Sequence, residues 1–200
     1  EALTSCNQAI ALKPDFAQAH NNLGNTLKEL GRLGEALASY TQAIALKPDY
    51  ALAHVNLGIA IKNAKFNSSK PELYPPLTQL LTAGNFTRPK DVAGSILSLL
   101  KHDVQIKDLL LEKNFAVSLS EATSIIRSLH KLPLLHQLMR LCPIPEPQFE
   151  ALFVAMRSLL LKNLDKMEVS PELIYFLSTL SMHCFTNEYV YIESAEETHL

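Results

Sequence analysis

The sequence predicts an all-α protein, in which pairs of antiparallel helices stack as an α-solenoid and a helical bundle-like domain follows. Three observations support this fold class. Leucine supplies 36 of the 200 residues and glycine only 6, which favours helices. A segment of the first third is repeated along the chain, and prolines divide the remainder at intervals that suit helices.

The repeat becomes visible when residues 1–29 are aligned with residues 35–63. The two segments agree at 19 of 29 positions, which corresponds to a period of 34 residues. Residues 9–15 return unchanged as residues 43–49. A period of 34 with this content resembles the tetratricopeptide repeat, which has two antiparallel helices per unit.

The resemblance assigns a place in the array to each early segment. Residues 1–14 form a second helix without its first, and residues 17–50 form a whole repeat. Residues 51–65 form the first helix of a further unit. We therefore predict a repeat domain over residues 1–66 and a separate all-helical domain over residues 67–200.

Small and large residues alternate as packed helices require. Gly24 lets the paired helix approach closely, and Gly31 and Gly34 bracket the turn, where positive φ is often needed. His20 and His54 occupy equivalent positions and are expected to pack between helices. The residues predicted to be buried are Leu23, Leu27, Tyr40, Leu57 and Ile61.

Helix starts and stops continue after residue 67. Ser118 or Ser120 is suited to cap a helix that has Glu121 in its first turn, and Ser170 precedes the helix of residues 173–185. The other helices expected here are residues 71–83, 88–100, 104–111, 134–141 and 146–164.

A second resemblance covers about residues 70–195. The segments of residues 88–93, 153–160 and 180–191 are similar to bacterial proteins that join tetratricopeptide repeats to a class I methyltransferase domain. This resemblance implies that the chain stops just before the catalytic domain. The glycine-rich nucleotide loop of such a domain is not found in the sequence, so no catalytic residue is carried over.

A polar face carries the candidate site. In tetratricopeptide arrays the first helices line the concave face, so the resemblance places Asn22 and Asn56 in a groove, one repeat apart. An asparagine both donates and accepts, so it suits the main chain of an extended peptide. The predicted peptide-binding residues are Asn22, Asn25, Asn56, Lys28 and Lys62. The alternative is a merely solvated surface.

Related repeats help to define this site. The asparagine ladder resembles that of O-linked N-acetylglucosamine transferases. The carboxylate-clamp repeats of chaperone adaptors fit less well, because they need a lysine where this chain has Asn21.

Composition argues against several other functions. Lys and Arg number 18 and Asp and Glu 20, with a pI near 6.4, which argues against nucleic-acid binding. No apolar run approaches the length of a membrane span. The cysteines Cys6, Cys142 and Cys184 have no CxxC spacing and are expected to be buried, reduced thiols of a cytoplasmic protein.

No set of residues suggests catalysis, a metal or a cofactor. His130 and His136 are separated by Pro133 and lie on different helix faces, so they do not chelate one metal. The adjacent His183 and Cys184 point to different faces, which argues against a nucleophile pair. We therefore expect no cofactor, and we expect the acidic residues 193–197 to be a solvated linker.

The predicted function is a non-catalytic scaffold that binds a protein or peptide partner. The alternative is the recruiting arm of a SAM-dependent methyltransferase or a glycosyltransferase whose catalytic domain lies outside this chain. We expect both chain ends to lie inside a longer protein. The apolar side of the first helix (Ala2, Leu3, Cys6 and Ile10) predicts either self-association or a longer array.

Overall fold

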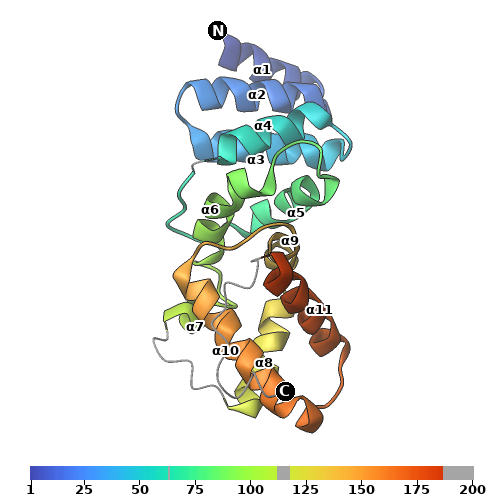
Figure 1. The fold of residues 1–200 in the computed structure, drawn as a ribbon. Helices are drawn as coiled ribbons and strands as arrows, with labels where there is room; N and C mark the ends of the chain where they lie inside the picture. Colours follow the sequence, from blue (N-terminus) through green and yellow to red (C-terminus); the bar gives the residue numbers. More distant parts are fainter. Residues whose placement is uncertain (63, 112–117, 187–200) are drawn as a thin grey trace. The chain divides into compact units, whose positions relative to one another are not determined.

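The protein is all-helical, as predicted, in a computed structural model that describes residues 1–62, 64–111 and 118–186. The described residues contain eleven α-helices and two short 3₁₀ helices, and no strand (Figure 1). They form two compact units. The first consists of residues 1–65 and 70–95, and the second of residues 66–69 and the described residues from 96 on.

The first unit contains the repeat. Its elements are α1 (Ala2–Leu12), α2 (Ala17–Glu29), α3 (Leu33–Leu46), α4 (Ala51–Ile61), η1 (Pro71–Leu73), α5 (Tyr74–Ala83) and the first part of α6 (Pro89–Leu100). Helix α2 packs against α1 and α3, and α4 packs against α3 and also against α2 (Figure 1). Helices α2 and α4 therefore hold equivalent places in successive repeats.

The predicted close approach within a repeat is confirmed at Gly24. A Cβ atom added there would lie 2.5 Å from the Cε1 atom of Tyr40, whose side chain is fully buried. Gly31, with φ 73°, makes the turn between α2 and α3. The same role predicted for Gly34 is wrong, because Gly34 already lies inside α3 and has no positive φ.

Four of the five residues predicted to be buried are buried: Leu27, Tyr40, Leu57 and Ile61. The prediction is wrong for Leu23, which is only half-buried. Leu57, the equivalent of Leu23 in α4, is buried because α4 packs against α2, the first helix of the preceding repeat. Among the described residues, helix α2 has no preceding first helix to pack against and contacts α1 instead. Helix α1 contains no buried residue at all.

In each repeat, a histidine of the first helix makes a hydrogen bond to a carbonyl oxygen of the turn that precedes this helix. The Nε2 atom of His20 lies 2.9 Å from the carbonyl oxygen of Pro14, and that of His54 lies 2.8 Å from the carbonyl oxygen of Pro48. His54 is buried and stacks on Phe86 with ring centroids 5.0 Å apart. The predicted packing role is therefore confirmed for His54, and for the half-buried His20 it stays a prediction.

Helix α5 extends the array beyond the sequence repeat. It packs against α3 and α4, the contacts that the second helix of a further unit makes. Residues 70–95 accordingly cluster with the first unit. The domain boundary expected between residues 66 and 67 stays a prediction.

The second unit contains α7 (Lys107–Leu111), α8 (Leu119–His130), α9 (Pro133–Leu141), α10 (Pro147–Asn163), η2 (Leu164–Lys166) and α11 (Pro171–Thr186). Ser118 and Glu121 form a capping box at the start of α8. The Ser170 hydroxyl accepts a hydrogen bond from the Leu173 N–H in the first turn of α11. The cap predicted at Ser118 and the helix start predicted at Ser170 are thus confirmed. Helix α11 packs against α8 and α9.

Candidate functional site

The predicted site residues lie in the first unit, on α2 and on α4 or directly after it, and together with their neighbours at helical spacing they define the candidate surface. We call this surface the α2–α4 face. It consists of Gln18, Asn22, Asn25 and Lys28 on α2, of Leu52, Asn56 and Ile59 on α4, and of Lys62, which directly follows α4. These residues recur every three or four positions, so each set forms a single stripe on its helix. Equivalent members of the two stripes are 34 residues apart.

The two predicted ladder asparagines have different environments. Asn22 is exposed, and among the described residues its side chain has no hydrogen bond. Asn56 is half-buried, and its Nδ2 atom donates to Oδ1 of Asn21 at 2.9 Å. Asn21 is 3% exposed, so this bond satisfies a buried carbonyl across the junction between α2 and α4. Asn56 therefore also supports the fold, in addition to the binding role predicted for it.

Asn25 is also part of the structure of its own repeat. Its Oδ1 atom accepts a hydrogen bond of 2.8 Å from the hydroxyl of Tyr40. Burial, and then the negative charge of Glu29, raise the pKa of Tyr40 to about 12. The tyrosine therefore remains a neutral donor, and the amide nitrogen of Asn25 is the part left for another partner.

The two predicted lysines also differ. Lys62 lies 3.4 Å from a carboxylate oxygen of Asp91 in an exposed ion pair. Lys28 is half-buried and makes no ion pair with any residue that the structure describes. An exposed pair such as that of Lys62 contributes little to stability. Lys28 is thus the cation of this face whose charge is not compensated by a direct partner among the described residues.

The α4 half of the face has an apolar character that the sequence analysis missed. Leu52 is 60% exposed and Ile59 is 56% exposed, whereas the equivalent residues of α2 are Gln18 and Asn25. The clue in the sequence was that α4 is apolar around most of its circumference and contains no Lys, Arg, Asp or Glu.

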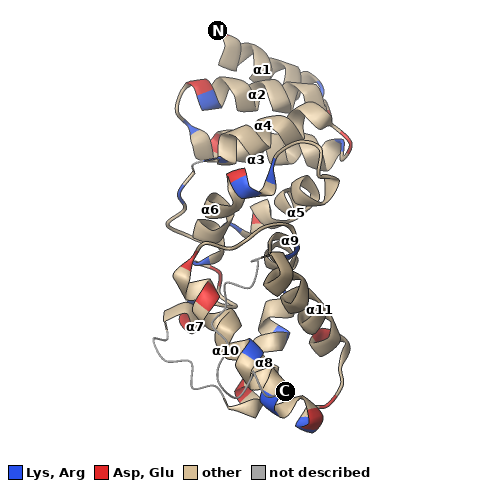
Figure 2. Ribbon diagram, viewed as in Figure 1, with Lys and Arg blue, Asp and Glu red and all other residues tan. Residues whose placement is uncertain are grey.

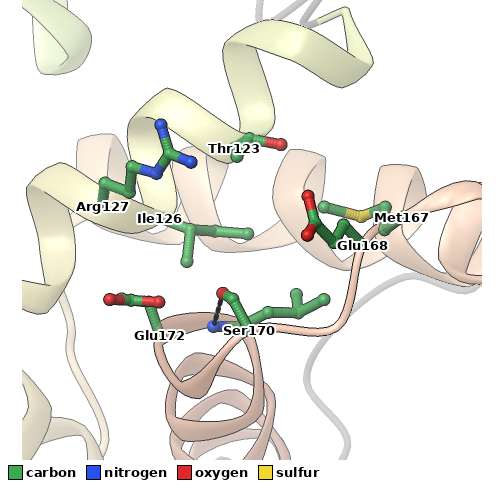
Figure 3. A pocket seen from close by; sticks show the side chains of 8 residues that line it. Thr123, Ile126, Arg127, Met167, Glu168, Ser170 and Glu172 are labelled. Atoms are coloured by element: carbon green, nitrogen blue, oxygen red, sulfur yellow. Dashed lines mark hydrogen bonds between the residues drawn. The ribbon is translucent and has the colours of Figure 1, made fainter.

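A small pocket in the second unit is a separate candidate. It has a volume of about 120 Å³, and Thr123 and Arg127 of α8 face Glu168, Ser170 and Glu172 across it (Figure 3). Sites for organic ligands usually measure about 300–1,000 Å³. The pocket is smaller than this range, and the hydroxyl of Ser170 in its lining already caps α11.

The carboxylate of Glu172 in this pocket has a lowered pKa. The first cause is hydrogen bonding to its own backbone N–H, and the second is the hydroxyl of Ser170. Electrostatic interaction with His130 and with the guanidinium of Arg127 lowers this pKa further. These interactions keep the start of α11 negatively charged, which suits the positive end of the helix dipole.

An aromatic and histidine cluster lies inside the second unit. His136 contacts Tyr175, with ring centroids 4.6 Å apart, and its Nε2 atom lies 3.1 Å from the carbonyl oxygen of Leu129. Burial lowers the pKa of His136 to about 4. His183 lies 3.2 Å from the carbonyl oxygen of Met139 through its Nδ1 atom. Both histidines thus serve packing.

The cysteines are free thiols. Cys142 is buried, and burial raises its pKa to about 11, which makes it a poor nucleophile at neutral pH. Cys6 and Cys184 are only half-buried, so the expectation of three buried thiols is wrong for these two. Helix α1 lacks cover on the side where Cys6 lies, which explains its exposure.

Two further features concern the described part of the chain only. Within it, no group of three or more His, Cys, Asp or Glu side chains is placed to hold a metal ion. No helix there has both the length and the apolarity required to cross a bilayer. The acidic residues 193–197 lie outside the described residues.

The comparison with protein families matches the first unit. A family model described as TPR repeat matches residues 1–31 and residues 24–63. Residues 1–63 are therefore similar to the tetratricopeptide repeat. Such repeats generally mediate protein–protein interactions, which indicates an interaction scaffold and not a catalytic domain for this part of the chain.

The comparisons with curated proteins and with solved structures return no match. The resemblance of residues 70–195 to the helical region of bacterial methyltransferase proteins therefore stays a prediction.

Proposed function

We propose that the chain is a non-catalytic interaction scaffold whose TPR repeats bind an extended peptide across the α2–α4 face. The observation that carries this proposal is the environment of Asn22. Its amide is exposed on a helix of the repeat array, and neither its donor nor its acceptor is used by a described residue. Such a group is suited to pair with the N–H and C=O groups of a peptide main chain.

The other predicted site residues assist in different ways. Asn56 holds α4 against α2 through Asn21 and so fixes the spacing of the face. Asn25 offers its amide nitrogen while Tyr40 uses its oxygen. Lys28 supplies an uncompensated positive charge, and Lys62 shares its charge with Asp91. The main contact with the peptide is therefore assigned to Asn22.

The test begins with random peptides displayed on phage and selected on the purified 200-residue protein. Binding of the selected peptide is then measured for the wild type and for Asn22→Ala. Loss of one neutral hydrogen-bonding site weakens binding by about 2- to 12-fold. The matched control is Asn7→Ala, because Asn7 is an exposed asparagine on α1 and is not one of the residues of this face. No selected peptide, or equal losses for both variants, would contradict the proposal.

A second role is compatible with the same face. The segments that resemble methyltransferase proteins support a recruiting arm, in which this chain holds a substrate for a methyltransferase or glycosyltransferase domain outside it. The open reading frame decides between the two roles. A glycine-rich strand–loop–helix encoded shortly after residue 200 favours the recruiting arm, and its absence favours the plain scaffold.

Contact through α1 is a further part of the proposal. Leu3, Cys6 and Ile10 are only half-buried on a helix that has no buried residue. Either a second copy or a further repeat would cover this apolar side. Sedimentation velocity tests the first of these, since a strictly monomeric species at high concentration contradicts self-association.

A further inference from the structure

We propose that the peptide bound by the α2–α4 face carries a large apolar side chain, held by α4, and a carboxylate about three residues away, held by Lys28. This inference rests on the proposed function and deepens it. The two halves of the face differ chemically. Helix α2 recognises the main chain and the carboxylate of the peptide, and α4 recognises its apolar side chain.

The two repeats themselves provide the first argument. Three positions are amides in α2 and aliphatic in α4: Gln18 becomes Leu52, Asn21 becomes Val55, and Asn25 becomes Ile59. The first and third of these lie on the outward stripe. On the same stripe the asparagine at positions 22 and 56 and the lysine at positions 28 and 62 are retained. The change therefore makes α4 apolar and leaves the asparagine and lysine positions of the face in place.

Exposure provides the second argument. Leu52 and Ile59 are more than half exposed, and Val55 between them is half-buried. Helix α4 carries no Lys, Arg, Asp or Glu, so its ribbon is uniformly tan in Figure 2. Two large apolar side chains that are exposed on one helix, with a half-buried valine beside them, form a patch suited to contact with another molecule. A peptide side chain that covers this patch gains the free energy of removing apolar surface from water.

Charge complementarity defines the rest of the occupant. Lys28 lies at the end of α2, and no described residue forms an ion pair with it. Glu29 directly follows Lys28 in the sequence, and Lys62, the equivalent lysine of the next repeat, forms an ion pair with Asp91. A peptide carboxylate therefore finds its best partner on the α2 half, away from the apolar patch.

The spacing follows from helix packing. Axes of packed helices lie about 8–10 Å apart, and α2 packs directly against α4. An extended peptide advances about 3.3 Å per residue. Ile59 lies three positions before Lys62, the equivalent of Lys28, so it is offset from Lys28 by only about 4.5 Å along the helix axis, whereas Leu52 is offset by about 15 Å. A peptide that crosses from Lys28 to Ile59 therefore covers about 10 Å in about three residues. The geometry points to an extended segment with an acidic residue and a leucine-like residue separated by two others.

The chain offers a matched variant for the test. Leu52→Gln together with Ile59→Asn installs on α4 the side chains that α2 carries at the same positions, so the repeat fold tolerates them. The probes are two fluorescein-labelled peptides of Gly, Ser and Ala that contain Asp and, three positions later, either Leu or Ser. Binding to the 200-residue protein is measured by fluorescence anisotropy, and folding is checked by circular dichroism.

The wild type should bind the Leu peptide at least about 10-fold more tightly than the Ser peptide, because the leucine is buried against α4. The double variant should lose this preference and still bind both peptides weakly. Lys28→Gln should weaken both peptides in low salt and leave the preference for Leu unchanged. Each peptide is also compared with the same peptide lacking Asp, which isolates the contribution of the carboxylate.

The outcomes separate this inference from the function on which it rests. If peptides bind in a manner that depends on Asn22 but with equal affinity for Leu and Ser, the inference is wrong and the proposed function stands. If neither these peptides nor any phage peptide binds, both are wrong. If the wild type sediments as a dimer and the double variant as a monomer, the occupant is a second copy and the inference is overturned.

Discussion

The hydrogen bond between Asn56 and Asn21 makes two equivalent asparagines differ in their effect on stability. Asn56→Ala removes the donor that satisfies the buried Oδ1 atom of Asn21. Leaving a buried polar group without its partner costs about 1–3 kcal/mol. Asn22→Ala removes an exposed side chain that has no described partner, so its effect should stay within about 0.5 kcal/mol.

Differential scanning calorimetry measures this difference. For a unit of this size, 1 kcal/mol corresponds to roughly 4–8 °C in Tm. Asn56→Ala should therefore lower the melting temperature of the first unit by at least about 4 °C, and Asn22→Ala should leave it nearly unchanged. The loss should appear only in the transition of the first unit, because both asparagines lie there.

A rescue variant checks the reason for the loss. At the position of Asn21, α4 carries Val55, so Asn21→Val is compatible with this helix. Asn21→Val combined with Asn56→Ala removes both partners of the hydrogen bond, and replacing both is nearly neutral. The double variant should recover most of the lost stability. Equal melting temperatures for Asn56→Ala and Asn22→Ala would refute this reasoning.

Two other predictions concern packing and pH. Gly24→Ala places a Cβ atom 2.5 Å from the buried ring of Tyr40 and should destabilise the first unit by about 1–3 kcal/mol in urea denaturation. Gly94→Ala, which meets no atom within 4 Å on α6, should stabilise it by up to about 1 kcal/mol. His136 has a folded pKa of about 4, below its ordinary value of 6.5, so the unfolded state binds more protons between these values. The free energy of unfolding should fall by about 2 kcal/mol between pH 7 and pH 5, and His136→Phe should flatten this slope.

The features that the sequence predicted correctly depend on local patterns. The repeat is encoded by near-identical segments, and Ser118 caps α8 through residues three positions apart. Gly31 takes positive φ directly after α2. Each of these depends on neighbouring residues or on the period of one helix, so a single sequence contains the necessary information.

The features that it did not predict depend on tertiary neighbours. Leu23 and Leu57 are the same residue at the same repeat position, but only Leu57 has an earlier first helix beside it. Asn56 pairs with Asn21, 35 positions away, and not with a residue of its own repeat. Equivalent positions in two repeats therefore have the same backbone conformation but different neighbours. For this reason the sequence predicted the same role for Asn22 and Asn56, although only Asn56 has a structural partner.

The central claim is that a peptide binds to the α2–α4 face and that Asn22 contacts its main chain. Titration of the isotope-labelled chain with the phage-selected peptide, followed by NMR chemical shifts, tests this claim most directly. The largest changes should appear at the side-chain amide of Asn22 and at the methyl groups of Ile59. Changes confined to α1 or to helices α7–α11, with the Asn22 amide unmoved, would contradict it.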